Sequence, residues 1–188
     1  KLVEKDGVHI MTGGLMASTA YALAPYIDSK EIPMTYPIMS ADDITQRKIP
    51  KWIIRTGWAS CQPHQVFGEY AYNVLKFKKI SVIAYDFAFG WECVGGFHKA
   101  FEDSGGKILQ KIWVPMTAQD FSPYLSQISK DADAVFAVFS GRLTMQFTKQ
   151  YQEFGLKAKI PLIGGGTVTD EHALPSMGDE AIGIITSL

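Results

Sequence analysis

The sequence predicts an α/β fold in which parallel strands alternate with helices along the chain. Short apolar runs indicate the strands, and most of them are continuously apolar, as is typical of strands covered by helices on both faces. Between these runs, apolar residues recur at the i, i+4 and i+7 spacing of a helix that buries one side. Gly7, the pair at 105–106 and Gly155 fall where a helix should end and a strand begin, which fits glycine helix caps. This order of elements implies parallel sheets with right-handed crossovers.

Eight apolar runs are expected to form the strands, and in chain order they are residues 8–11, 33–36, 52–56, 80–85, 108–114, 134–139, 161–163 and 182–185. Three helices follow from spaced apolar side chains, which are Phe97 and Phe101, then Phe121, Leu125 and Ile128, then Phe147, Tyr151 and Phe154. Residues 1–5 are interpreted as a helix in progress, and the polar segment 40–51 as a linker. Since complete domains rarely begin inside a helix and stop on a strand, we expect a fragment that is incomplete at both ends.

The composition is that of a globular protein and excludes several classes of function. Hydrophobic residues make up 47% and charged residues 20% of the 188 residues, unlike a disordered or fibrous chain. The 18 basic and 19 acidic residues leave a formal net charge of −1, so there is no overall positive field to hold nucleic acid. No apolar run approaches the roughly 20 residues that span a bilayer. Nucleic-acid binding and a membrane-spanning role are therefore not expected.

The search for chemistry concentrates on the loops that follow the strands, because ligands of parallel sheets bind beyond the carboxyl ends of the strands. The first such loop, residues 13–19, is a pair of glycines that opens into a helix, and free N–H groups at a helix start favour an anion. The loop fits neither the dinucleotide nor the P-loop pattern, so a carboxylate is expected rather than a nucleotide phosphate. The alternative is a structural turn in which Ser18 is only the helix cap.

Aromatic and apolar side chains in other strand-end loops are candidates for the wall of a pocket. Phe89 is the best candidate to stack on a ligand ring. Phe87 and Trp91 could line the same pocket, but each of them taken singly is interpreted as a core residue. Trp58 and Met39 are equally compatible with a pocket wall and with the edge of the core.

Polar candidates are few. Arg142 directly follows the strand at 134–139 and could clamp a carboxylate with two hydrogen bonds, or could be a solvated residue of a helix start. Cys61 and His64 could be a nucleophile and its base only if a third group orients them, and they are only half of a zinc site. The sequence therefore predicts no metal and no cofactor.

Eight short motifs follow one another along the whole chain. They are GGLMAS at 13–18 with AP at 24–25, IPM at 32–34 with Pro37, RT at 55–56, Tyr85 with FG at 89–90, DFSPYL at 120–125, DAV at 133–135, GLK at 155–157 and GDEAIG at 178–183. In this order they resemble the type I periplasmic solute-binding proteins of ABC importers, specifically the branched-chain amino acid binding family. Each motif is weak by itself, and the resemblance depends on their common order.

The resemblance implies two Rossmann-like lobes with parallel sheets that close on a small ligand. Residues 1–61 correspond to the later half of lobe 1, residues 62–181 to lobe 2, and residues 182–188 to the return crossing toward lobe 1. The resemblance further implies a non-catalytic, monomeric, periplasmic receptor that delivers its ligand to a membrane permease. The family's first strands and final segment have no counterpart here, which agrees with the expected fragment.

The strand-end loops and the resemblance together give the expected ligand-binding residues, which are Met16, Ala17, Ser18, Ile38, Met39, Ser40, Trp58, Phe89, Ser140, Arg142, Gly165 and Gly166. Ile38 would contribute its backbone, and Ser40 its hydroxyl. Amino-acid binders of the family carry an acidic residue in the last of these loops, where this chain has three glycines at 164–166 followed by Thr167. A buried ammonium group without a counter-charge is costly. The expected ligand is therefore a small organic carboxylate with an aromatic ring, of the benzoate or cinnamate type.

Three alternatives remain open. A branched-chain or related amino acid is the ligand if Asp43 or Asp170 meets its ammonium group. An α/β enzyme with Cys61 as its nucleophile is the second, and a cytoplasmic ligand sensor built on the same two lobes is the third.

Overall fold

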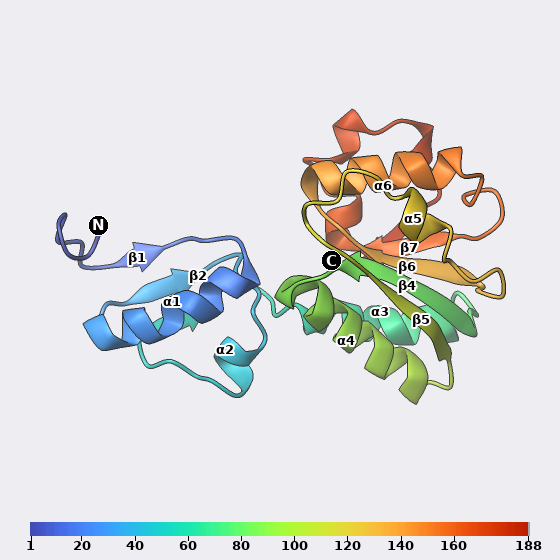
Figure 1. Cartoon of the computed structure of the whole chain (residues 1–188). Helices are drawn as coiled ribbons and strands as arrows, with labels where there is room; N and C mark the ends of the chain where they lie inside the picture. The colour runs from blue at the N-terminus through green and yellow to red at the C-terminus, as the bar shows by residue number, and fades with distance from the viewer. Residues whose placement is uncertain (188) are drawn as a thin grey trace. The chain divides into compact units, whose positions relative to one another are not determined.

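The computed structural model describes residues 1–187, and the chain divides into two compact units, Lys1–Ser60 and Cys61–Leu188 (Figure 1). Each unit has its own parallel sheet, with three strands in the first unit and five in the second. The predicted α/β class with parallel sheets is confirmed. The assignment of the units to lobe 1 and lobe 2 stays a prediction. No helix within residues 1–187 combines the length and the apolarity needed to cross a bilayer.

The sheet of the first unit consists of β1 (Met11–Thr12), β2 (Met34–Tyr36) and β3 (Ile53–Arg55), in that spatial order. The helix α1 (Ala17–Lys30) buries one stripe of side chains, which are Ala17, Ala20, Ala24 and Ile27. Three of these four residues are alanines, whose side chains are short. The axis of α1 can therefore lie close to the neighbouring elements of the unit.

Two expectations about the first unit are wrong. Residues 1–5 form hydrogen-bonded turns instead of a helix. The segment 40–51 is not a linker, because it contains the one-turn helix α2 (Asp43–Gln46) and buries Ile44 at 2% exposure. The guanidinium group of Arg55 donates a hydrogen bond of 2.6 Å to a main-chain carbonyl of this segment, which joins it to the end of β3. Polar side chains here make contacts within the fold rather than marking a flexible connection.

The second unit has the strand order β5-β4-β6-β7-β8, with all neighbours parallel. The strands are β4 (Lys79–Tyr85), β5 (Lys107–Val114), β6 (Ala134–Val138), β7 (Leu162–Gly165) and β8 (Ile185–Ser187). The helices are α3 (Cys61–Asn73), α4 (Ala88–Asp103), α5 (Ser122–Leu125) and α6 (Gly141–Glu153), with short 3-10 turns η1 (Gly166–Val168), η2 (Leu174–Ser176) and η3 (Asp179–Ala181). Helices α3 and α4 cover one face of the sheet, and α5 and α6 cover the other (Figure 1).

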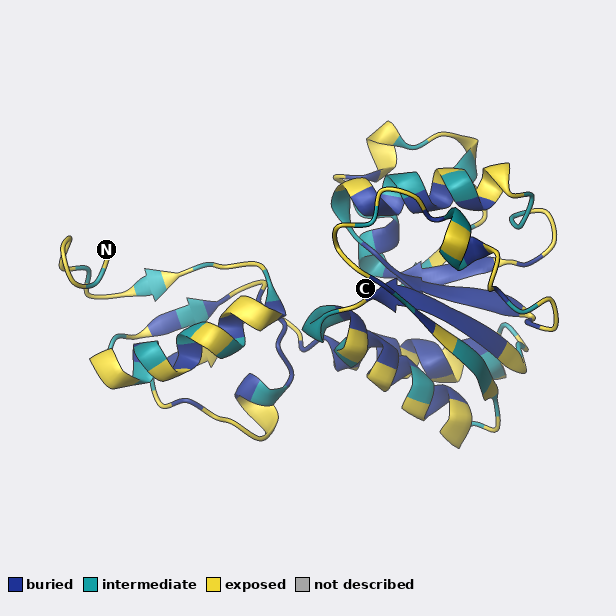
Figure 2. Cartoon of the chain, in the orientation of Figure 1, coloured by how far each residue is buried: buried dark blue, intermediate teal, exposed yellow. Residues whose placement is uncertain are grey.

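Burial of the central strands on both faces explains their apolar composition. Every residue of β6 and all but the first of β4 are buried (Figure 2). Val82 and Phe136 belong to the core that packs on α3 and α4, whereas Ile83 and Ala137 belong to the core under α5 and α6. Neither side of these strands meets water, so the sequence shows continuous apolar runs rather than alternation.

The first and last strands begin about three residues later than the sequence predicts. The first run was expected at 8–11, and the last at 182–185. Ile185 of β8 pairs with Ile163 of β7. Of the segment 182–188, which the resemblance assigns to a return crossing, residues 185–187 thus form the fifth strand of the second unit, and Leu188 lies outside the described residues.

The order of the strands defines where a ligand can approach the second unit. From β4 the chain goes to its neighbour β5, and it then crosses to β6 on the other side of β4. The carboxyl ends of β4 and β6 are therefore adjacent at a point where the connections diverge. Such a switch point leaves a crevice between loops, and parallel sheets characteristically bind ligands there.

Candidate functional site

The side chain of Tyr85, the last residue of β4, connects the two strand ends at the switch point of the second unit. Tyr85 is only 4% exposed. Its hydroxyl donates a hydrogen bond to the carbonyl of Ser140 (2.9 Å) and accepts one from the Ser140 N–H (3.4 Å). The loop after β4 and the loop after β6 are thus joined by one phenol group. The sequence singled out Ser140 but gave Tyr85 no role beyond its place in a motif.

Three aromatic rings follow one another from this point toward the surface. The ring centroids of Tyr85 and Phe87 are 5.1 Å apart, and those of Phe87 and Phe89 are 6.3 Å apart. Phe89 is half-buried in the first turn of α4, and it packs against both cores of the unit. Phe87 is also half-buried and packs on the core, but Trp91, which was interpreted as a core residue, is 50% exposed. The indole N–H of Trp91 donates to the carboxylate of Asp86 (3.1 Å), so the ring lies on the surface beside the loop.

Arg142 lies in the first turn of α6 with its guanidinium group exposed to solvent. Its Nη1 donates to the side-chain carbonyl of Gln146, one turn further along the same helix (3.1 Å). The amide of Gln146 in turn donates to the carbonyl of Gln119. This is the solvated arrangement that the sequence left open, and a carboxylate held by Arg142 would have to compete with the bond to Gln146.

The end of β7 is built so closely that side chains do not fit at its last two positions. A Cβ atom at Gly165 would lie 2.5 Å from Nε2 of His64, and one at Gly164 would lie 2.8 Å from a carbonyl oxygen of β6. Gly166 begins η1 and is half-buried, and the hydroxyl of Thr167 donates to the carbonyl of Phe139 (2.7 Å). At positions 164 and 165, at the end of β7, packing therefore leaves no room for an acidic side chain.

The corresponding edge of the first unit carries the glycine turn that follows β1. Gly14 adopts a φ of +91°, and a Cβ atom there would lie 1.5 Å from the terminal methyl of Met39. Met39 is 1% exposed. The side chain of Met39 therefore packs against the turn from the interior of the unit. It occupies the space that a Cβ atom at position 14 would need.

The helix α1 starts two residues earlier than it would if Ser18 were its N-cap. Met16 is the N-cap residue and makes no side-chain capping bond, and Ala17 is the first helical residue, with 2% exposure. Ser18 is the second residue of the helix and is exposed. The alternative in which Ser18 serves only as a cap is wrong, because its position is inside the helix.

Ser40 is tied to a residue that the sequence gave no role. Its hydroxyl and that of Ser60 are 2.8 Å apart, and the N–H and hydroxyl of Ser60 both donate to the Ser40 carbonyl (2.8 and 2.9 Å). Ser40 is 4% exposed and Ser60 is fully buried. By contrast, Ile38 and Trp58 reach solvent, with 59% and 37% exposure. A ligand that bonds to the Ser40 hydroxyl would share it with Ser60.

The expected residues thus gather at the carboxyl edges of the two sheets, each set within its own unit. The first unit contributes Met16, Ala17, Ser18, Ile38, Met39, Ser40 and Trp58, and the second contributes Phe89, Ser140, Arg142, Gly165 and Gly166. Three neighbouring strand ends supply each set. Tyr85, Ser60 and His64 were missed as their partners. The one signal for Tyr85 was a side chain with a polar hydroxyl directly after the apolar run 82–84 of β4.

Cys61 and His64 lie in the first turn of α3 and are both buried, at 9% and 2% exposure. The imidazole ring of His64 packs edge-on against Phe136, with the ring centroids 5.9 Å apart. Burial among helices and strands makes the thiol of Cys61 a poor candidate for a nucleophile, which needs access to its substrate. Within residues 1–187, no three His, Cys, Asp or Glu side chains gather as a metal site would require.

Comparison with known proteins gives one family and several solved relatives. The family model described as periplasmic binding protein matches residues 1–188. A Leu/Ile/Val-binding protein homolog of Brucella melitensis is 31% identical over 190 residues, which is 100% of this chain and 48% of that protein. The chain therefore spans about half the length of the curated relatives it matches.

Two solved structures of solute-binding proteins from ABC transporters of Rhodopseudomonas palustris share the fold. One, in complex with benzoate, is 29% identical with a TM-score of 0.92, and the match covers 99% of this chain and 51% of that one. The other, from strain BisB5 in complex with 3,4-dihydroxybenzoic acid, is 32% identical with a TM-score of 0.88, and the match covers 97% of this chain and 50% of that one.

Proposed function

Because this chain belongs to the periplasmic binding protein family, we propose that it is part of the solute-binding component of an ABC importer and that its ligand is a small aromatic carboxylate. The family binds solutes and is not a family of enzymes, so the expected lack of catalysis is confirmed and the enzyme with a Cys61 nucleophile is wrong. The expected periplasmic location agrees with the same family, and the cytoplasmic sensor is set aside.

The main support for an aromatic ligand is found at the carboxyl edge of the second unit, where aromatic rings are present and the end of β7 has no acidic side chain. Phe89 extends a row of packed rings toward the surface, while the last two residues of β7 and the residue after it, 164–166, are glycines. An apolar ring gains from burial against such side chains, at about 25 cal/mol per Å² of apolar surface. An α-ammonium group buried beside them would lose its hydration without gaining a counter-charge.

The two acids that could serve an amino-acid ligand already have partners. Asp43 accepts a hydrogen bond from Nε of Arg47 (2.7 Å) and forms an ion pair with Nη2 of the same guanidinium group (2.6 Å). Asp170 accepts bonds from the N–H groups of His172 (3.1 Å) and Ala173 (2.8 Å). Either carboxylate would have to give up these contacts to meet an ammonium group, which weighs against the branched-chain alternative.

Two relatives at about 30% identity support the aromatic ligand by what they hold, benzoate in one and 3,4-dihydroxybenzoic acid in the other. The curated relative favours the second candidate, because it is named a Leu/Ile/Val-binding homolog. A branched-chain amino acid is therefore kept as the alternative ligand. Closure of two lobes, a monomeric state and delivery to a membrane permease belong to the same proposal and rest on the family alone.

Thermal unfolding of the full-length gene product with benzoate, 4-hydroxycinnamate, leucine or glutamate tests the proposal. A ligand present at 100 times its dissociation constant adds about 2.7 kcal/mol to the free energy of unfolding, which raises the melting temperature by several degrees. We expect this shift with the aromatic acids and none with leucine or glutamate. A shift with leucine alone would contradict the argument from the missing acid and favour the alternative.

A further inference from the structure

The backbone of Ser140 is fixed by another residue rather than by its own side chain. Ser140 is the N-cap residue of α6, in extended conformation, and its hydroxyl makes no capping hydrogen bond. Both of its main-chain polar groups bond to the hydroxyl of Tyr85, the carbonyl at 2.9 Å and the N–H at 3.4 Å. The next residue, Gly141, has a φ of +57°, so the chain turns sharply directly after this anchor.

This anchor determines the direction of the peptide that opens α6. In a trans peptide the N–H of Gly141 points opposite to the carbonyl of Ser140. Since that carbonyl is turned toward Tyr85, the Gly141 N–H is turned away from it. A peptide released from Tyr85 could rotate, because glycine at 141 places little restriction on its own backbone. The side chain of Arg142 begins at the next residue, and its direction depends on the same turn.

The ring of Tyr85 reaches the other loop of the candidate site as well. Its centroid lies 5.2 Å from that of Phe139 and 5.1 Å from that of Phe87, and Phe87 packs on Phe89. One buried side chain therefore contacts both the row of rings that ends in Phe89 and the turn that carries Ser140 and Arg142. A ligand could place its ring on Phe89 and its carboxylate near the turn at Ser140. In that case Tyr85 determines the distance between the two contact points.

We propose that Tyr85 is a positioning residue for ligand binding, whose hydroxyl holds the turn at Ser140 in register with the ring of Phe89. The inference rests on the proposed function, because it assigns to this side chain a part in recognising a ligand that has both a ring and a carboxylate. Tyr85 acts through the backbone of Ser140.

The chain offers a closely matched control in Tyr151. This residue is 1% exposed, belongs to the same core, and donates its own hydroxyl hydrogen bond of 2.9 Å to the carbonyl of Ile160. Ile160 precedes β7, so this bond lies at the amino end of the sheet. Tyr85→Phe and Tyr151→Phe each delete one buried hydroxyl that donates to a backbone carbonyl, and each leaves the ring packing intact.

Two measurements on the full-length gene product separate positioning from plain stability. The first is calorimetric titration of wild type and both variants with benzoate and with leucine. The second is amide hydrogen exchange of the segment 139–143 in the absence of any added compound. We expect similar losses of melting temperature in the two variants. Only Tyr85→Phe should weaken binding, by roughly tenfold, and only Tyr85→Phe should speed exchange in 139–143.

The outcomes distinguish this inference from the proposed function. If wild type binds leucine and not benzoate, the proposal of an aromatic ligand is wrong. A loss of leucine affinity in Tyr85→Phe but not in Tyr151→Phe would then still support the positioning role of Tyr85. Unchanged affinity in Tyr85→Phe, or equal losses in both variants, overturns the positioning role. If wild type binds neither compound, the proposed ligands are wrong. Unchanged exchange of 139–143 in Tyr85→Phe would then overturn the anchoring of Ser140 as well, whereas faster exchange in that variant would support it.

Discussion

The imidazole of His64 lies directly against the backbone of Gly165, so that a Cβ atom at position 165 would be 2.5 Å from its Nε2. His64 comes from the first turn of α3 and Gly165 from the end of β7. Both residues are buried, with His64 at 2% exposure. The imidazole of His64 therefore leaves no room for a side chain at the end of β7, although the two residues are about 100 positions apart in the sequence.

Gly165→Ala should destabilise the second unit by about 1–3 kcal/mol, because overpacking forces His64 from its place. The same substitution in a His64→Ala background should cost clearly less, since the obstructing ring is gone. Gly95→Ala is the control, because Gly95 is a helical residue of α4 with no atom within 4 Å of its Cβ position. Urea unfolding of wild type, the two single variants, the double variant and the Gly95→Ala control measures the difference, and equal costs in the two backgrounds would disprove the contact as the cause.

A carboxylate at position 166 should change the class of ligand. Gly166 is the first residue of the 3-10 turn η1, and the negative φ of such a turn is one that residues with side chains also adopt. Gly166→Glu supplies a counter-charge for an ammonium group and repels a carboxylate, so leucine should gain affinity and benzoate should lose it. Titration of the variant with both compounds measures this. Gly166→Gln has nearly the same size without the charge, and if it had the same effect, sterics rather than charge would be responsible.

Ser81 offers a test of polar burial in the centre of β4. Its side chain is fully buried, and its hydroxyl has no hydrogen-bond partner within residues 1–187. Burying a hydroxyl without a partner costs free energy, so Ser81→Ala should leave the free energy of unfolding unchanged or raise it by up to about 1 kcal/mol. Thr148→Val is the contrasting variant. The hydroxyl of Thr148 donates to the Thr144 carbonyl (2.9 Å), so its removal should lower the free energy of unfolding. A clear loss of stability in Ser81→Ala would count against this prediction.

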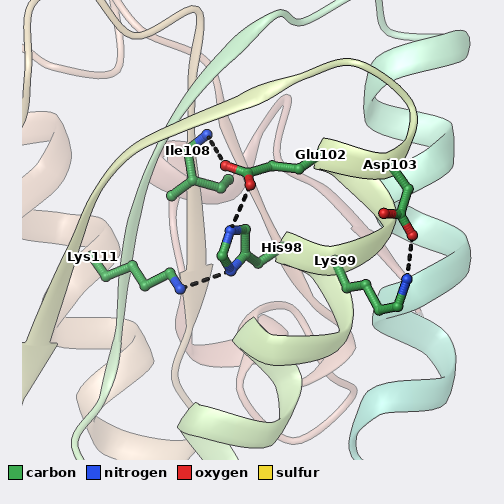
Figure 3. A network of polar contacts seen from close by, with 6 residues as sticks. All are labelled: His98, Lys99, Glu102, Asp103, Ile108 and Lys111. Atoms are coloured by element: carbon green, nitrogen blue, oxygen red, sulfur yellow. Dashed lines mark hydrogen bonds and ion pairs between the residues drawn. The ribbon is translucent and has the colours of Figure 1, made fainter.

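Glu102 should make the stability of the second unit depend on pH. Its carboxylate accepts a hydrogen bond from the N–H of Ile108 (3.1 Å) and faces Nε2 of His98 at 3.0 Å (Figure 3). The backbone bond, followed by the contact with His98, lowers the pKa of Glu102 from its usual 4.5. A lowered pKa in the folded state gives stability that is present above pH 4.5 and is lost as the pH falls through the folded pKa.

Glu102→Gln should therefore lower the free energy of unfolding at pH 7 by about 0.5 kcal/mol, a small value because the group is exposed to solvent. The difference from wild type should shrink toward pH 3. Asp103→Asn is the comparison, since Asp103 lies on the surface and forms an ion pair with Lys99 (Figure 3). Urea unfolding at the two pH values decides the matter, and a difference that persists at pH 3 would point to lost packing instead of lost charge.

Much of the secondary structure could be predicted because burial leaves a local pattern in the sequence. The run 134–139 anticipates β6, whose five residues are all buried. Helix α3 was missed because its buried residues include Cys61, His64 and Gly68, with Phe67 as the one large apolar side chain. A helix that packs through small and polar residues shows no apolar stripe.

The sequence by itself determined the class of fold, the approximate places where most strands end, and the absence of an acid at the end of β7. These properties depend on the spacing of neighbouring residues and on which side chains follow a buried strand. Only the tertiary structure decided that Tyr85 bonds to Ser140, that His64 lies against Gly165, and that Met39 lies under Gly14. Such pairs join residues far apart in the chain, and they form because the order of strands in each sheet brings particular loops together. The period of a helix or a strand carries no information about that order, so no local pattern could have revealed these contacts.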